Sequence, residues 1–129
     1  MKFQRFFISV LLVSFCHNSL ATQAPSATRG EIDMLFKQLQ ASGCQFNRNG
    51  TWYSGAEAQS HLTKKLEYFE NKNMIKNTED FITHAASVSS TSGKAYQVKC
   101  GNNPAMESKT WLLEQLKTIR GSGTSSTSK

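Results

Sequence analysis

Apolar residues recur at helical spacing in four segments of the chain. In residues 31–41 they fall at i, i+3, i+4 and i+7, the pattern of an amphipathic helix. A second helix is predicted from Ser54 to about residue 69, because Ser54 and Glu57 form the S-x-x-E sequence of a capping box. A third helix begins after Asn77 or Thr78 and buries the apolar side chains that follow, and the last helix covers residues 108–120.

Two segments between these helices have strand patterns. Residues 44–53, CQFNRNGTWY, contain an Asn-Gly pair that suits the tight turn of a β-hairpin. Residues 95–100 alternate between apolar and polar positions, with Tyr96 and Val98 on one face. The order α-β-β-α-α-β-α therefore predicts an α+β fold, a small three-stranded antiparallel sheet with about four helices packed on it.

The N-terminal segment has the composition of an export signal. Lys2 and Arg5 precede the apolar run FFISVLLVSF, and a small-x-small sequence follows at 19–21. The run is too short to cross a bilayer, which takes about 20 apolar residues. Cys16 would suit a lipoprotein, but Phe15 stands where that signal needs a small residue. We expect cleavage after Ala21 and a periplasmic or secreted protein without a transmembrane anchor.

The remainder is predicted to form one domain. Residues 22–29 are polar and expected to be a flexible lead, residues 30–120 form a single α+β domain, and residues 121–129 form a disordered tail without apolar side chains. Cleavage would remove Lys2 and Arg5, so 13 of the 15 basic side chains remain against 9 acidic ones, a net charge of +4. The lysines are scattered rather than grouped with aromatic residues, which argues against a nucleic-acid interface.

The cysteines indicate a disulfide. Cys16 leaves with the signal, so Cys44 and Cys100 remain as a pair in a compartment where disulfides form. Closing so long a loop would stabilise the domain by about 4 kcal/mol in the chain-entropy model. Two free thiols or half of a metal site are the alternatives, but the chain has no C-x-x-C, and His61 and His84 alone make no ligand spacing. We expect no metal and no cofactor.

The segment SVSSTSGKAYQVKC, residues 87–100, contains the residue types of two familiar sites. Gly93 and Lys94 resemble the end of a phosphate-binding loop, but the required first glycine and the following Ser or Thr are missing. A nucleophilic serine would need a base, and the chain has neither G-x-S-x-G nor S-x-x-K. No catalytic residue is assigned, although His61 with a serine of this segment remains an alternative.

One polar set remains as a candidate binding site. Its hydroxyl, imidazole and cationic side chains come from the hairpin, the second helix and the third strand, which could be neighbours. Together they would suit a small anion or a peptide carboxylate, and internal structural bonds would explain them equally well. The set is Arg48, Tyr53, His61, Lys65, Ser90, Lys94 and Tyr96.

Two blocks, FNRNGTWYSGAEAQSHLTKKL and NTEDFITHAASVSSTSGKAYQVKC, resemble a family of small exported bacterial proteins of unknown function. The pattern combines R-N-G-x-x-Y, A-x-x-H-L-x-x-K, E-D-F-I and S-S-x-[ST]-G-K-x-Y. Asn77 stands where the family often has threonine, and Ala95 where it often has proline. The resemblance implies export and a single domain, and it supplies no activity. The matching residues are Arg48, Asn49, Gly50, Tyr53, His61, Leu62, Lys65, Phe81, Ser90, Gly93, Lys94 and Tyr96.

These observations favour a non-enzymatic binding or accessory module for an anionic ligand or an envelope partner. A small Ser/His hydrolase or transferase is one alternative, and it requires His61 within hydrogen-bond reach of Ser89, Ser90 or Ser92. A structural or stress-related envelope protein without a ligand is the other, and it predicts an exposed apolar patch or a self-association surface.

Overall fold

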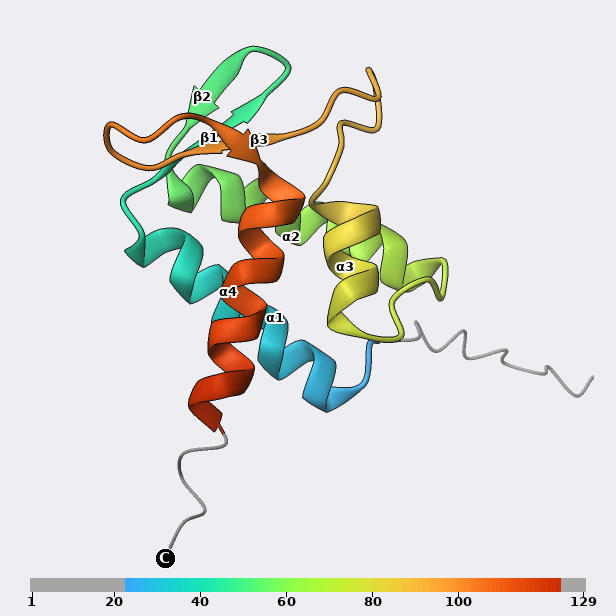
Figure 1. Cartoon of the computed structure of the whole chain (residues 1–129). Helices are drawn as coiled ribbons and strands as arrows, with labels where there is room; N and C mark the ends of the chain where they lie inside the picture. Colours follow the sequence, from blue (N-terminus) through green and yellow to red (C-terminus); the bar gives the residue numbers. More distant parts are fainter. Residues whose placement is uncertain (1–22, 124–129) are drawn as a thin grey trace, which may run out of the picture.

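The computed structural model describes residues 23–123, so the predicted signal peptide and residues 124–129 of the predicted tail lie outside the described residues. Figure 1 shows the sheet at one end of the molecule, with the helices gathered beneath it. The elements are α1 (Ser26–Ala41), β1 (Gln45–Arg48), β2 (Thr51–Tyr53), α2 (Gly55–Asn71), α3 (Thr78–Ala85), β3 (Gln97–Lys99), β4 (Met106–Glu107) and α4 (Ser108–Gly123).

The α+β class is confirmed, but the predicted sheet of three strands is wrong, since the described part contains four. The strand order is β2-β1-β3-β4, and each neighbouring pair is antiparallel. The additional strand, β4, pairs Met106 with Val98. Two residues are too few to show an alternating pattern, so this strand is defined by its pairing with β3 and not by its own sequence.

The pairing of β1 with β3 explains the disulfide. Gln45 lies opposite Lys99, so the residues just before and just after them, Cys44 and Cys100, meet at the same end of the two strands. The two cysteines are bonded, with their Cα atoms 4.3 Å apart. The predicted disulfide is therefore present, and it joins the two central strands of the sheet.

Helix α1 begins at Ser26, earlier than the predicted start, so residues 26–29 of the predicted flexible lead are helical. Buried Glu70 holds this end in place, because its carboxylate accepts hydrogen bonds from the Ala24 backbone N–H at 3.0 Å and from Arg29 Nε at 2.6 Å. At the other end of the chain α4 continues to Gly123, so residues 121–123 belong to a helix and not to the predicted tail.

The local signals for turns and caps are confirmed. Ser54 and Glu57 form the capping box at the start of α2, and Asn77 caps α3 through Asp80 N–H. Asn49 and Gly50 both have positive φ, 53° and 86°, as the tight turn between β1 and β2 requires.

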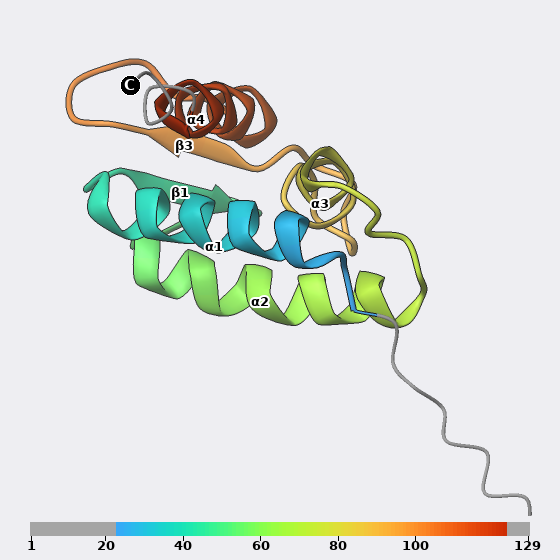
Figure 2. The same cartoon turned by 90° about the horizontal axis from the view of Figure 1, so that it is seen from below.

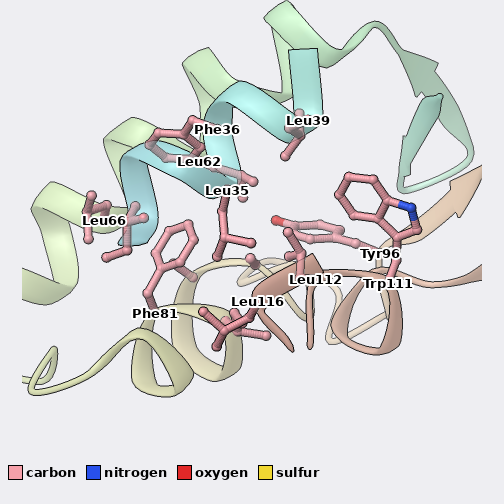
Figure 3. Packing of buried hydrophobic residues seen from close by; sticks show 14 of the residues in the cluster. Leu35, Phe36, Leu39, Leu62, Leu66, Phe81, Tyr96, Trp111, Leu112 and Leu116 are labelled. Carbon is pink, nitrogen blue, oxygen red and sulfur yellow. The ribbon is translucent and has the colours of Figure 1, made fainter. Parts of the chain in front are cut away.

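The core lies between the helices and beneath the sheet. Figure 2 shows α1 and α2 side by side, and Figure 3 shows their apolar side chains meeting those of α3 and α4. Phe36 of α1 packs edge-on against Phe81 of α3, with ring centroids 5.6 Å apart. Phe46 of β1 packs in the same way against Trp111 of α4 at 5.5 Å. The contact between Phe46 and Trp111 packs one face of the sheet against the helices. This inner face of the sheet carries the site described next.

Candidate functional site

A cavity of about 310 Å³ lies where the hairpin and the start of β3 meet α2. Phe46 and Arg48 alternate along β1, and Tyr53 lies directly opposite Phe46 in the sheet, so these three side chains share the inner face. The opposite wall is α2. The residues that line the cavity are Phe46, Asn47, Arg48, Tyr53, Glu57, Ala58, Ser60, His61, Leu62, Lys64, Tyr96, Gln97 and Ser108.

His61 is at the centre of a hydrogen-bonded cluster. Arg48 Nη1 lies 2.6 Å from its Nδ1 and 3.0 Å from its Nε2, and the Tyr96 hydroxyl oxygen lies 3.2 Å from Nε2. Because a guanidinium only donates, it requires an unprotonated ring nitrogen, and Nδ1 is the nearer one. In that tautomer Nε2 carries the proton and donates a hydrogen bond to the Tyr96 hydroxyl oxygen. The imidazole is then neutral and held between Arg48 and Tyr96.

Lys65 lies behind this cluster and is buried, with 9% of its surface exposed. Its ammonium donates to the Val88 carbonyl oxygen at 2.8 Å and to the Tyr96 hydroxyl oxygen at 3.3 Å. It also lies 5.0 Å from the centre of the Tyr96 ring, within reach of a cation–π interaction. In the His61 tautomer assigned above, the Tyr96 oxygen accepts two hydrogen bonds, from His61 and Lys65, and its own hydrogen is left to donate.

Burial and neighbouring cations set the charge state of the cluster. Burial lowers the pKa of His61, and the positive charges of Arg48, Lys65 and Lys64 lower it further. Burial also lowers the pKa of Lys65, with a smaller contribution from Arg48. The pKa of Tyr96 is raised by burial, and the Arg48 charge opposes this in part. His61 and Tyr96 are therefore both held in their neutral forms beside the cations.

Within residues 23–123 no carboxylate forms an ion pair with Arg48 or Lys65. The one carboxylate in the cavity wall, Glu57, accepts the Ser54 backbone N–H at 2.8 Å in the capping box, and that bond lowers the pKa of Glu57. Arg48 and Lys65 thus have no carboxylate counter-ion in the part of the chain that the structure describes.

Five of the seven predicted site residues meet here. Arg48, Tyr53, His61 and Tyr96 line the cavity, and Lys65 contacts Tyr96 from behind. Arg48 also lies over the Tyr53 ring, 5.7 Å from its centre.

The other two predicted site residues, Ser90 and Lys94, lie outside the cavity and are exposed. They belong to a turn that closes on itself, since Ser89 N–H donates to the Lys94 carbonyl oxygen at 2.9 Å and a bridge pairs Val88 with Ala95. Their closeness to Tyr96 in sequence placed them in the predicted set, and this local turn separates them from it.

The serines of this turn have structural partners. The Asn49 side-chain amide donates to Ser89 Oγ at 3.0 Å, and Ser92 Oγ donates to Asn49 Oδ1 at 2.5 Å, so the turn is bonded to the tip of the hairpin. In the described part of the chain His61 hydrogen-bonds to Arg48 and Tyr96 and to no serine. The arrangement that a Ser/His hydrolase requires is therefore not assembled.

Sequence reasoning missed several residues of the cavity wall. Glu57 and Ala58 precede His61 by four and three positions on α2, and Lys64 follows it by three, so the helical period could have indicated all three as neighbours of His61. Ser108 gave no such signal. It reaches the cavity because its backbone N–H donates to the Tyr96 carbonyl oxygen at 2.8 Å, a contact between segments separated by a loop.

The described residues contain neither a metal-binding cluster nor a helix suited to span a membrane. No three His, Cys, Asp or Glu side chains between residues 23 and 123 come together in a way that could hold a metal ion. No helix in this range combines the length and the apolar composition needed to cross a membrane.

Comparison with known proteins gives the family and no relative of known activity. No curated protein matches the chain. No solved structure matches it either. One family model matches residues 26–120, which is most of the chain and includes every element that forms the cavity. The chain therefore belongs to DUF5329, a family of unknown function.

Proposed function

We propose that this protein is a small exported binding module that holds a small organic anion in the cavity between the hairpin and α2, without converting it chemically. The observation that carries the proposal is the pair of cations, Arg48 and Lys65, joined through His61 and Tyr96 with no carboxylate partner in the described part of the chain.

A buried cation without a counter-ion is costly, because the charge loses its hydration. Lys65 replaces part of that hydration with two neutral acceptors, and its charge stays uncompensated. Arg48 has five N–H donors and uses Nη1 on His61, so the rest of its planar fork is available to a ligand. An anion at Arg48 would supply the missing charge to both cations.

The rest of the wall supports the same ligand charge. Lys64 adds a third cation, and Ser108 is the first residue of α4, so the positive end of that helix dipole lies at the wall. The opposing carboxylate, Glu57, is already bonded to the Ser54 backbone. The electrostatic potential of the cavity is therefore expected to favour an anion.

Export is supported by the predicted signal over residues 1–21 and by the disulfide. A bond between Cys44 and Cys100 persists in oxidising compartments and is rare in a reducing cytosol. A periplasmic or secreted location is therefore part of the proposal. A protein that meets small metabolites or envelope fragments there would need a cavity open to solvent, and Lys64 at its wall is exposed.

The test is a titration of the oxidised protein, purified from the exported fraction, with sodium acetate and with sodium phosphate at constant ionic strength. We expect saturable amide and side-chain NMR shifts around Arg48, His61 and Tyr96. Arg48→Gln should remove the saturable shifts. Lys94→Gln is the matched control, since it removes the same charge from an exposed residue outside the cavity.

The two variants separate a site from a general charge effect. Anion binding that survives Arg48→Gln, or that falls equally in Lys94→Gln, would reject the proposal. Thermal unfolding of both variants, followed by circular dichroism, checks that each one is folded before its binding is compared.

A further inference from the structure

The cavity changes in character from its opening to its floor. Arg48 is half-buried and Lys64 is exposed, so these two cations lie on the solvent side, whereas Lys65 is buried behind Tyr96. Phe46 and Leu62 are almost fully buried, 7% and 5% exposed, and they form the deep part with half-buried Ala58. A ligand that satisfies both regions has an anionic group near solvent and an apolar group directed inward.

The size of the cavity limits that ligand. Pockets that bind small molecules span about 300–1,000 Å³, and this one, at about 310 Å³, is at the lower end. An apolar group of a few carbons fills such a space, whereas a long acyl chain exceeds it.

The charges of the wall favour a monoanion. Glu57 lies in the same wall as Arg48 and Lys64, and its negative charge repels a bound anion. This repulsion is half as strong for a monoanion as for a dianion at the same position. A carboxylate carries one charge, and its two oxygens match the planar fork of Arg48. With Nε2 of His61 donating to Tyr96, as the assigned tautomer requires, the hydroxyl hydrogen of Tyr96 is left to donate to a ligand oxygen.

We infer that the ligand is a short amphipathic carboxylic acid, bound with its carboxylate at Arg48 and its hydrocarbon chain against Phe46, Ala58 and Leu62. This inference rests on the proposed function, since it specifies the anion that the cavity holds. It excludes inorganic phosphate and simple sugars as the preferred ligand, because neither has an apolar part for the floor of the cavity.

The test is isothermal titration of the purified, oxidised protein with acetate, butanoate and hexanoate, and with hexanol as the uncharged counterpart. Each buried methylene should tighten binding about fourfold, so each step of two carbons gives roughly 16-fold until the cavity is full. Hexanol should bind at least tenfold more weakly than hexanoate, since it lacks the charge-assisted bond to Arg48.

A pair of variants tests where the chain lies. Ala58→Leu places a larger side chain in the apolar part of the cavity and should remove most of the gain from acetate to hexanoate while acetate binding persists. Ala56→Leu is the matched control, because Ala56 is on the same helix, exposed, and outside this cavity. It should leave the chain-length dependence unchanged.

The outcomes separate the inference from the proposed function. Equal affinity for acetate and hexanoate, both lost in Arg48→Gln, would overturn the amphipathic acid and leave the anion site standing. Phosphate binding more tightly than hexanoate would also overturn it. No binding of any acid would reject both. If affinity rises with the length of the acid and Ala58→Leu does not change this dependence, the assigned position of the hydrocarbon chain is overturned.

Discussion

At Gly55 the backbone of α2 lies close against that of α1, and replacing this glycine by alanine tests the packing that positions the cavity. A Cβ atom at Gly55 would lie 2.2 Å from the Leu39 carbonyl oxygen and 2.9 Å from the carbonyl carbon. Ordinary contact begins near 3.4 Å, so the oxygen would have to move by about 1.2 Å. Both atoms are backbone of a helix packed in the core, and no side-chain rotation relieves the overlap.

Overpacking a core costs about 1–3 kcal/mol, and a clash with backbone belongs at the upper end, so Gly55→Ala should lower the free energy of unfolding by about 3 kcal/mol. Gly30→Ala is the matched control, because Gly30 lies inside α1 and a Cβ there meets nothing within 4 Å. Alanine is the better helix former by about 1 kcal/mol, so this variant should be more stable than the wild type.

The assay is urea unfolding followed by circular dichroism, with thermal unfolding as a second measure. For a domain of this size 1 kcal/mol corresponds to about 4–8 °C, so Gly55→Ala should melt at least about 12 °C below the wild type and Gly30→Ala a few degrees above it. Equal unfolding midpoints for the two variants would refute the close approach of α1 and α2. Because α2 carries His61 and Ala58, the same variant should also weaken acid binding.

Three further predictions concern charge and the disulfide. Since the pKa of His61 is lowered in the fold, the unfolded chain binds the imidazole proton more tightly than the folded chain does. The contribution of His61 to stability should therefore be complete above the ordinary pKa of 6.5 and be lost as the pH falls below it. Urea unfolding midpoints at pH 7.5 and 5.5 should show this loss of stability, and His61→Gln should reduce it. Glu70→Gln removes the charge of a buried carboxylate whose partner, Arg29, is 34% exposed, so it should lower the free energy of unfolding by about 2 kcal/mol. An unchanged urea unfolding midpoint would contradict the anchoring of α1 by Glu70. Reducing the Cys44–Cys100 bond, which joins residues 56 positions apart, should cost about 4 kcal/mol and lower the melting temperature, whereas a protein with both cysteines replaced by alanine should not respond to the reductant.

The turns and helix caps that were predicted correctly are encoded locally. Asn49 and Gly50 specify their turn by the backbone angles they tolerate, and Ser54 with Glu57 specifies the start of α2 through two hydrogen bonds three residues apart. Strand β4 and the first turn of α1 are different, because they depend on partners distant in sequence. The first turn is held by Glu70, and no periodicity in residues 22–29 reveals that contact.

The site shows the same division between local and distant information. The structure brings His61 and Lys65 together because they are one helical turn apart on α2, and Tyr96 joins them from the neighbouring strand segment. Lys94 was grouped with them because it lies just before the predicted third strand. Its chain folds into a turn before the strand begins, so a separation of two residues from Tyr96 does not bring its side chain to the cavity.

The absence of a carboxylate partner for Arg48 and Lys65 in the described residues links the stability of the protein to its proposed function. An aspartate or glutamate side chain at the cluster would have neutralised the cations and raised the pKa of His61. It would thus have taken the place of the negative charge that a ligand would supply. The described structure instead keeps His61 neutral and leaves donors of Arg48 and Tyr96 unused. An anion bound at Arg48 would therefore raise the pKa of His61, so binding and proton uptake should reinforce each other. This coupling is the physical reason to measure acid binding at more than one pH, because an anion bound elsewhere on the surface, away from Arg48, would leave the protonation of His61 unchanged.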